Sequence, residues 1–321
     1  MIGIQEFHRR VPIRGFDGSY ALISRAAVRN TAIVFVHGLD GSPDDTWAQF
    51  QVLIDLYADD FPNFAESDLF FFAYDSMKLA VPFSAGICLQ FLRSVFPTPN
   101  PDILKLASGP LVKAFQSDLD SIAASIMDVK YQRLVLVGHS LGALLLRIAV
   151  WSAYRDTYNS VPIQANDSAL ELVTTMIAKD PLLGAQLVLF APALFHVGIF
   201  GRLGLAAITL SQIPWVGKGI LTALGMAVPA ISTLRGEDDI LKLTKEATEG
   251  EISKGRKARA LVARVMWGAK EQYLSMWQYQ WDGPVDFEPG LGHSEVCKPT
   301  PSYIKPLEFV HHGTTAGSTA H

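Results

Sequence analysis

Continuous apolar runs recur along the chain and alternate with segments of helical periodicity. Because these runs are apolar at successive positions rather than at every second one, they predict strands that are buried on both faces of a parallel sheet. The five runs, rich in β-branched and aromatic residues, are TAIVFV (31–36), DLFFFAY (68–74), RLVLV (133–137), AQLVLF (185–190) and ARVMW (263–267).

The segments between these runs have the spacing of helices. The stretch from Ser42 begins with an N-cap candidate, a proline at the first helical position and acidic residues in the first turn. Apolar residues recur at intervals of three and four over 112–126, and 141–154 is apolar on nearly every side, which is typical of a helix buried against a sheet. Strands that alternate with helices predict an α/β fold with helices on both faces of a mostly parallel central sheet.

The beginning of the chain and two later stretches depart from this alternation. Residues 9–24 predict a hairpin, broken between Gly15 and Gly18, whose antiparallel strands lie at one edge of the sheet. The stretches 76–114 and 192–232 are apolar but contain prolines and glycines. Neither holds the uninterrupted run of about 18 to 20 apolar residues that a membrane helix requires. We therefore expect both insertions to form an apolar cap over a binding site.

The composition limits the classes of function. The chain has 321 residues, 49% of them hydrophobic, and a net charge of −4, which suits one domain over 1–310 and a disordered tail at 311–321. A mildly acidic chain without a clustered basic face is not expected to bind nucleic acid. Cys88 and Cys297 are too few for a disulfide framework and are expected as buried thiols. The first residues contain no apolar signal-peptide region, so we expect a cytoplasmic protein.

One serine stands between a predicted strand and a predicted helix. In LVLVGHSLGALLLRIAV (134–150), Ser140 follows the apolar strand and precedes the apolar helix, with Gly138 and Gly142 on either side. A sharp turn from strand to helix strains the serine backbone and exposes its hydroxyl, and it requires glycines where any Cβ would collide with neighbouring backbone. The following helix also favours negative charge near Leu141. Ser140 is therefore the candidate nucleophile.

A nucleophilic serine needs a base, and His293 is the candidate that remains after elimination. It lies in the glycine-rich EPGLGHSEVCKP, after the last predicted strand, from where an imidazole can reach over the carboxyl edge of the sheet. The remaining histidines are expected in the two turns (His37, His139), an edge segment (His8), the cap (His196) and the tail (His311, His312, His321).

The third member of such a triad is a carboxylate between the serine and the histidine in chain order. Glu271 comes just after a predicted strand and Gly268, where a side chain can project toward the histidine loop. Its role would be to hold the imidazole in one tautomer and to stabilise the imidazolium. Asp282, Asp286 and Glu288 are alternatives that lie closer to His293 in the sequence.

A tetrahedral intermediate also needs N–H donors for its oxyanion. One is expected at Leu141, directly after the nucleophile, and the other in the turn that follows an earlier strand. The sequence IVFVHGLDG contains such a turn, and Leu39 is placed to donate from it.

Three motifs together resemble the α/β-hydrolase superfamily. VFVHGLDGSPDDTW (34–47), VGHSLGALLLR (137–147) and HSEVCKP (293–299) are similar to its lipase and esterase branch, related to the SERAC-type and PGAP-type serine hydrolases. The resemblance implies the same nucleophile, base, acid and oxyanion donors, and relatives that act on carboxylic esters without a cofactor. The chain departs from the pattern at FAPALFHVG (190–198), where many relatives have a threonine-proline-histidine-glycine turn, so the substrate class stays open.

These residues predict a carboxylic ester hydrolase that forms an acyl-enzyme on a hydrophobic ester. Acyltransferase, phospholipase, thioesterase and amidase activities need the same triad and remain alternatives, whereas a non-catalytic binding protein would be expected to lack one of these residue types. No group of His, Cys, Asp and Glu has the spacing of metal ligands, so neither metal nor cofactor is expected. The expected partner is a small-molecule or lipid ester, with contact to a lipid surface through the cap.

Overall fold

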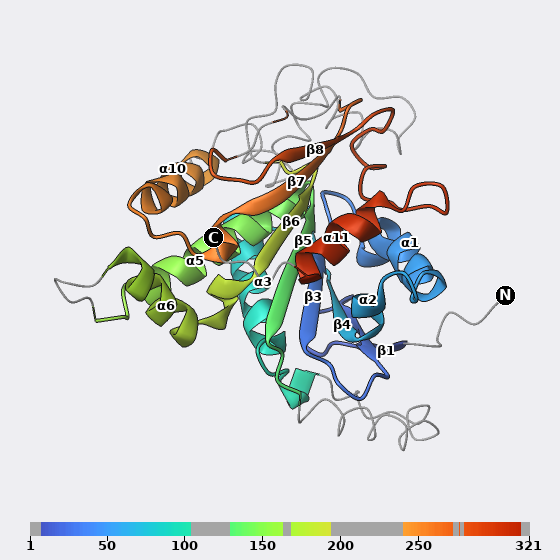
Figure 1. Ribbon diagram of the computed structural model, residues 1–321, viewed down its shortest axis with the longest axis horizontal. Coiled ribbons are helices and arrows are strands. Elements are labelled where there is room, and N and C mark those ends of the chain that lie inside the picture. The colour runs from blue at the N-terminus through green and yellow to red at the C-terminus, as the bar shows by residue number, and fades with distance from the viewer. Residues whose placement is uncertain are drawn as a thin grey trace.

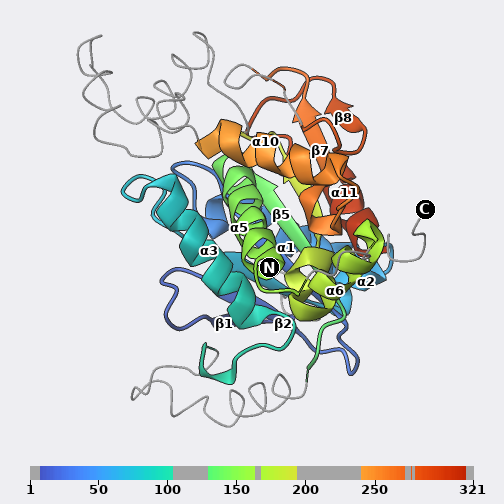
Figure 2. The ribbon, with the colours of Figure 1, turned by 90° about the vertical axis from the view of Figure 1, so that its left-hand side faces the viewer.

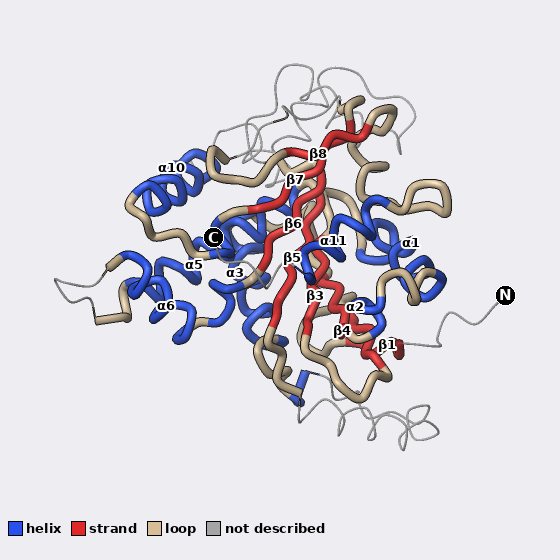
Figure 3. The backbone as a smooth tube through the Cα atoms, in the orientation of Figure 1, coloured by secondary structure: helices blue, strands red, loops and turns tan. Residues whose placement is uncertain are grey.

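An eight-stranded sheet runs through the centre of the molecule (Figures 1 and 3). The computed structural model describes residues 8–103, 129–162, 168–193, 240–271, 276 and 279–315. The sheet has the order β1-β2-β4-β3-β5-β6-β7-β8; the pairs from β4 to β8 are parallel, and β1 and β2 are antiparallel. The strands are β1 (His8–Pro12), β2 (Tyr20–Ser24), β3 (Thr31–Val36), β4 (Ser67–Phe72), β5 (Arg133–His139), β6 (Gln186–Phe190), β7 (Ala263–Gly268) and β8 (Val285–Glu288).

The strands predicted from continuous apolar runs are confirmed as β3 to β7, and the predicted edge hairpin is confirmed as β1 and β2. Strand β8 was not predicted. Its sequence, VDFE, is short and alternates with acidic residues, and three of its four residues are not buried. A strand at the edge of a sheet needs no continuous apolar run, which is why the pattern missed it.

Helices cover both faces of the sheet (Figures 1 and 2). This arrangement confirms the predicted α/β architecture. One face carries α1 (Pro43–Leu56), α2 (Pro62–Ala65) and α11 (Lys305–Thr315), and the other carries α3 (Val81–Val95), α5 (Leu141–Tyr158), α6 (Ala169–Lys179) and α10 (Ile240–Ser253). Three short 3-10 helices complete the described elements: η1 (Pro101–Ile103), η3 (Pro181–Gly184) and η4 (Arg259–Leu261).

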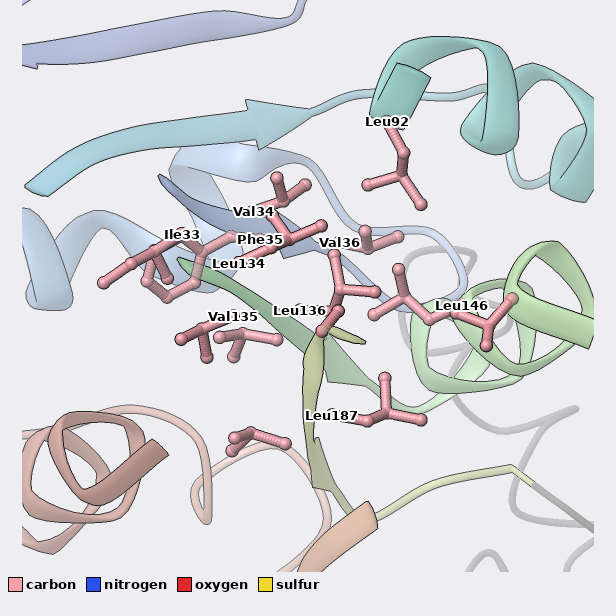
Figure 4. Close-up of a cluster of buried hydrophobic side chains, with 14 of the residues drawn as sticks. Ile33, Val34, Phe35, Val36, Leu92, Leu134, Val135, Leu136, Leu146 and Leu187 are labelled. Carbon is pink, nitrogen blue, oxygen red and sulfur yellow. The ribbon is translucent and has the colours of Figure 1, made fainter. Parts of the chain in front are cut away.

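The core lies between the sheet and these two layers (Figure 4). All six residues of β3 are buried, because successive side chains point to opposite faces and both faces are covered. Phe35 packs against Trp47 and Phe50 of α1, with ring centroids 5.2 and 5.4 Å apart. Burial of one such large apolar side chain contributes roughly 1.5 to 3 kcal/mol. This packing fixes the position of the central strands relative to α1, so the carboxyl ends of these strands are held in place.

Helix α1 begins as the sequence predicts. The Ser42 hydroxyl accepts a hydrogen bond of 3.1 Å from the Asp45 amide, and Pro43 is the first helical residue. The predicted helix over 112–126 lies outside the described residues. The predicted buried helix that follows Ser140 is confirmed as α5.

The structure describes only part of the two predicted cap segments, namely 76–103 and 192–193. Within the first, α3 packs along α5 and buries eight of its residues, so this part belongs to the layer that covers the sheet. The rest of both segments lies outside the described residues, so the cap and its contact with lipid stay predictions. Within the described ranges, no helix combines the length and hydrophobicity needed to cross a bilayer.

The predicted disordered tail is wrong over residues 311–315, which belong to α11. Gly313 packs so closely against the sheet that a Cβ there would lie 3.1 Å from a methyl group of Val188. The side chains of Asn63 and His311 also form a hydrogen bond of 3.1 Å between Nδ2 and Nε2. The sequence suggested disorder because the residues after His312 are small or polar and include no large apolar side chain.

Candidate active site

Ser140 occupies a strained turn between β5 and α5. Its φ is 52° and its ψ is −119°, a backbone conformation that costs a residue with a Cβ about 1 to 3 kcal/mol. The turn is held from the neighbouring strand, because the Ser140 amide donates to the Phe190 carbonyl at 3.0 Å and the Ser140 carbonyl accepts from Ala193 at 3.1 Å. Hydrogen bonds to β6, which lies beside β5 in the sheet, and to the residues just after it therefore hold Ser140 in this strained conformation.

The two glycines that flank Ser140 lie too close to neighbouring backbone to carry a side chain. A Cβ at Gly138 would lie 2.6 Å from the Ala143 Cα, and a Cβ at Gly142 would lie 2.3 Å from the His37 carbonyl oxygen. Real Cβ atoms do not approach backbone this closely, so any other residue would force β5, α5 and the turn after β3 apart. The elbow can form only because both positions lack a side chain.

The structure brings Ser140, His293 and Glu271 together. The Ser140 Oγ lies 2.9 Å from His293 Nε2, and a Glu271 carboxylate oxygen lies 2.7 Å from His293 Nδ1. Because a carboxylate only accepts hydrogen bonds, the neutral imidazole carries its hydrogen on Nδ1. This leaves the Nε2 lone pair to accept the serine hydroxyl hydrogen. The Glu271 side chain is fully buried and that of His293 is 6% exposed, so water screens this chain of hydrogen bonds little.

The loops that carry Glu271 and His293 are joined by backbone contacts at the end of β7. The Lys270 amide donates to the Leu291 carbonyl at 2.9 Å, next to Glu271 on one side and close to His293 on the other. Gly268 permits this approach, because a Cβ there would lie 2.5 Å from the same Leu291 oxygen. The loops that carry Glu271 and His293 are thus joined by a backbone hydrogen bond close to both side chains.

The alternative acids have other partners. Asp282 forms a buried ion pair with Arg147 of α5 and accepts hydrogen bonds from the Ala263 and Tyr279 amides. Glu288 pairs with Lys305 at the start of α11. Asp286 lies near Arg264. Burial lowers the pKa of this guanidinium, and the Asp286 carboxylate offsets only part of that effect. The carboxylate that contacts the imidazole is that of Glu271.

The turn expected to supply one oxyanion donor lies against Ser140. A Cβ at Gly38 would be 3.0 Å from the Ser140 Cβ, so the turn after β3 reaches the elbow directly. Leu39 follows in this turn, and Leu141 is the first residue of α5. Among the backbone hydrogen bonds between described residues, neither of these two amides donates to a carbonyl.

Two residues that the sequence did not single out hold this turn. The Ser76 hydroxyl accepts a hydrogen bond of 2.9 Å from the Asp40 amide, and Asp40 has a φ of 53°. The Tyr74 hydroxyl donates to the His37 carbonyl at 3.0 Å, and the two rings stack with centroids 4.5 Å apart. Both residues belong to the loop after β4, whose proximity to the turn follows from strand pairing and not from any local motif.

A cavity of about 560 Å³ opens beside the same turn. Its lining includes His37, Asp40, Tyr74 and Ser76. The lining does not include Ser140, Glu271 or His293.

Within the part of the chain that the structure describes, no three His, Cys, Asp or Glu side chains gather as ligands for a metal ion. Burial raises the pKa of the Cys297 thiol to about 12, so this cysteine, four residues after His293, stays protonated at neutral pH.

Comparison with known proteins rests on structure. No protein-family model and no curated protein matches the sequence. Esterase B from Lactobacillus rhamnosis, inhibited by a tributyrin phosphonate, superposes with a TM-score of 0.50 at 10% sequence identity, over 96% of this chain and 85% of that one. The chain has the α/β-hydrolase fold.

Two further structures are similar at lower scores. Esterase B with a C6-C4 inhibitor gives a TM-score of 0.49 at 10% identity, over 98% of this chain and 88% of that one. An esterase from Rhizomucor miehei gives 0.45 at 14% identity, over 96% and 82%.

Proposed function

We propose that this protein is a serine hydrolase that cleaves carboxylic esters with hydrophobic acyl groups. The observation that carries the proposal is the chain of two hydrogen bonds from Ser140 Oγ through His293 to Glu271, 2.9 and 2.7 Å long, anchored on a strained turn. A serine on the surface, or a histidine buried only for packing, would not be expected to form this chain of hydrogen bonds from hydroxyl to imidazole to carboxylate. The fold is consistent with the proposal, although one fold supports many activities.

The first half of the reaction follows from this geometry. The Ser140 oxygen attacks the ester carbonyl carbon while His293 Nε2 takes the hydroxyl proton. Glu271 accepts from Nδ1–H throughout and stabilises the imidazolium that forms. The amides of Leu39 and Leu141 donate to the oxyanion of the tetrahedral intermediate. When this intermediate collapses, the bond to the alcohol oxygen breaks, and His293 returns the proton to the leaving alcohol.

The second half releases the acyl group. His293 removes a proton from water, whose oxygen attacks the acyl carbonyl, and the bond from the acyl carbon to Ser140 Oγ then breaks. The carboxylic acid leaves, and the proton returns from His293 to the serine oxygen. No cofactor takes part in this scheme. The apolar stretches 104–114 and 194–232, which stay a predicted cap, support a hydrophobic acyl group, because each buried CH₂ contributes roughly 0.8 kcal/mol.

The proposal is tested with p-nitrophenyl esters of increasing acyl length and with a fluorophosphonate probe. We expect ester turnover by the wild-type protein, and a loss on the order of 10⁶-fold in Ser140→Ala. Mass spectrometry of the labelled protein should place the phosphonate on Ser140. Equal turnover by the wild-type protein and Ser140→Ala would exclude the proposal. Turnover that does not change between acetyl and palmitoyl esters would exclude a hydrophobic acyl pocket.

A further inference from the structure

His139, the last residue of β5, reaches across to the loop that carries His293. Its Nε2 lies 3.0 Å from the main-chain oxygen of His293, in a buried contact between residues that are 154 positions apart. A carbonyl oxygen only accepts hydrogen bonds, so Nε2 of His139 carries a hydrogen and donates it. The two rings lie with their centroids 5.0 Å apart.

The protonation state of His139 suits this bond. Burial, together with the neighbouring His293, lowers the pKa of His139 to about 3, so its ring is neutral near neutral pH. A neutral imidazole with its hydrogen on Nε2 has a lone pair on Nδ1. Nδ1 faces the turn after β3, because a Cβ at Gly38 would lie 3.0 Å from it. The ring of His139 thus lies between the two loops that approach Ser140.

The bond connects the main chain next to Ser140 with the main chain of His293. Glu271 holds the ring of His293 at Nδ1, and the Glu295 carboxylate accepts from the Gly292 amide at 2.8 Å. The first contact sets the rotation of the ring, and the second holds the amide before His293. The bond from His139 holds the carbonyl after the His293 Cα, so it bears on the distance from Nε2 to the serine oxygen.

We propose that His139 is a positioning residue that sets the distance between Ser140 and His293 through its Nε2–H bond to the His293 carbonyl. The inference rests on the proposed function, because it concerns proton transfer between those two residues. Without the donor, the buried carbonyl of His293 loses a partner and the loop moves toward another one. A displacement of the base by about 1 Å reduces the rate of a positioned reaction by on the order of 100-fold.

Two variants of similar size separate positioning from simple packing. His139→Leu fills the space and removes the donor, whereas His139→Gln retains an amide N–H near the place of Nε2. We expect kcat for a p-nitrophenyl ester to fall by about 10- to 100-fold in His139→Leu, with KM changed by less than about threefold. His139→Gln should recover most of this loss. His312→Leu, at an exposed position in α11, is the matched histidine-to-leucine control and should retain the wild-type kcat.

The rate of fluorophosphonate labelling at Ser140 should follow kcat across these variants. Equal losses in the Leu and Gln variants, or a wild-type kcat in His139→Leu, would overturn the inference. Such results differ from failure of the proposed function, in which the wild-type protein and Ser140→Ala hydrolyse esters equally.

A spectroscopic measurement on the wild-type protein covers the case in which the leucine variant does not fold. Nitrogen-15 NMR of ring-labelled histidine should find His139 with its hydrogen on Nε2 and with a coupling across the hydrogen bond to the His293 carbonyl carbon. A hydrogen on Nδ1 instead would overturn the inference.

Discussion

Asp282 and Arg147 form an ion pair inside the molecule, with their side chains 0% and 2% exposed. Arg147 also donates to the Leu261 carbonyl at 2.9 Å and lies 4.2 Å above the ring of Tyr279. Through these contacts, α5, the helix that follows Ser140, is joined to the segment that precedes β7 and to the segment before β8. Asp282 is therefore a structural carboxylate, although its sequence position made it a candidate acid.

This pairing predicts that Asp282→Asn lowers mainly the stability of the protein, whereas Glu271→Gln lowers mainly kcat. Asp282→Asn leaves a buried guanidinium without its counter-charge, so we expect a loss of about 3 to 5 kcal/mol in the free energy of unfolding. The folded fraction should retain kcat. Glu271→Gln should leave stability nearly unchanged and lower kcat by on the order of 10⁴-fold, because an amide favours the wrong imidazole tautomer. Urea unfolding and ester hydrolysis measure the two effects; a reversal of the pattern would assign the acid to Asp282.

The strained backbone at Ser140 predicts a difference between two inactive variants. Ser140→Ala and Ser140→Gly both lack the hydroxyl, but only glycine adopts a φ of 52° without strain. After the entropy that glycine loses on folding is subtracted, Ser140→Gly should be the more stable by about 1 kcal/mol. Thermal unfolding of both proteins checks this value. Equal melting temperatures would mean that the turn stores no strain at this residue.

Two glycine-to-alanine substitutions should act in opposite directions. The new Cβ in Gly142→Ala would lie 2.3 Å from the His37 carbonyl, so the turn that carries Leu39 must move. We expect a loss of about 1 to 3 kcal/mol in stability and of on the order of 100-fold in kcat. Gly86→Ala, within α3, meets no atom within 4 Å and should raise stability by up to about 1 kcal/mol, with kcat unchanged. Wild-type kcat in Gly142→Ala would show that the turn tolerates displacement.

The buried histidines predict a loss of stability in acid. Burial lowers the pKa of His37 from 6.5 to about 4, and that of His139 to about 3. Because the unfolded chain binds protons at these residues first, their contribution is complete above about pH 6.5 and is lost as the pH falls toward these lower values. Each residue contributes a slope of up to about 1.4 kcal/mol per pH unit in that window.

Urea unfolding between pH 7 and pH 4.5 measures this slope. His37→Gln removes one titrating group and should lower the slope by the contribution of one histidine, which is up to about 1.4 kcal/mol per pH unit. An unchanged slope in His37→Gln would show that this imidazole takes up its proton at the same pH in the folded and the unfolded chain, which contradicts a lowered pKa in the folded protein.

The sequence alone predicts the strands of the sheet interior and the turn at Ser140, because both are local in origin. Continuous apolar runs reflect burial on two faces, and they predict β3 to β7 without knowledge of strand order. The turn needs glycines at 138 and 142 for steric reasons that hold wherever a strand turns sharply into a helix. Elimination among the eight histidines also leads to His293, since the others lie in segments with different patterns.

Only the tertiary structure decides which groups meet around that turn. Four carboxylates follow β7 within a short stretch, and their sequence positions do not separate them. The structure places Glu271 on the imidazole and Asp282 on Arg147. The loop after β7 contacts the loop that carries His293, whereas the segment before β8 pairs with α5. Ser76, Tyr74 and His139 support the site from other elements. Such contacts join residues far apart in the chain, and only the order in which strands pair brings them within hydrogen-bond distance.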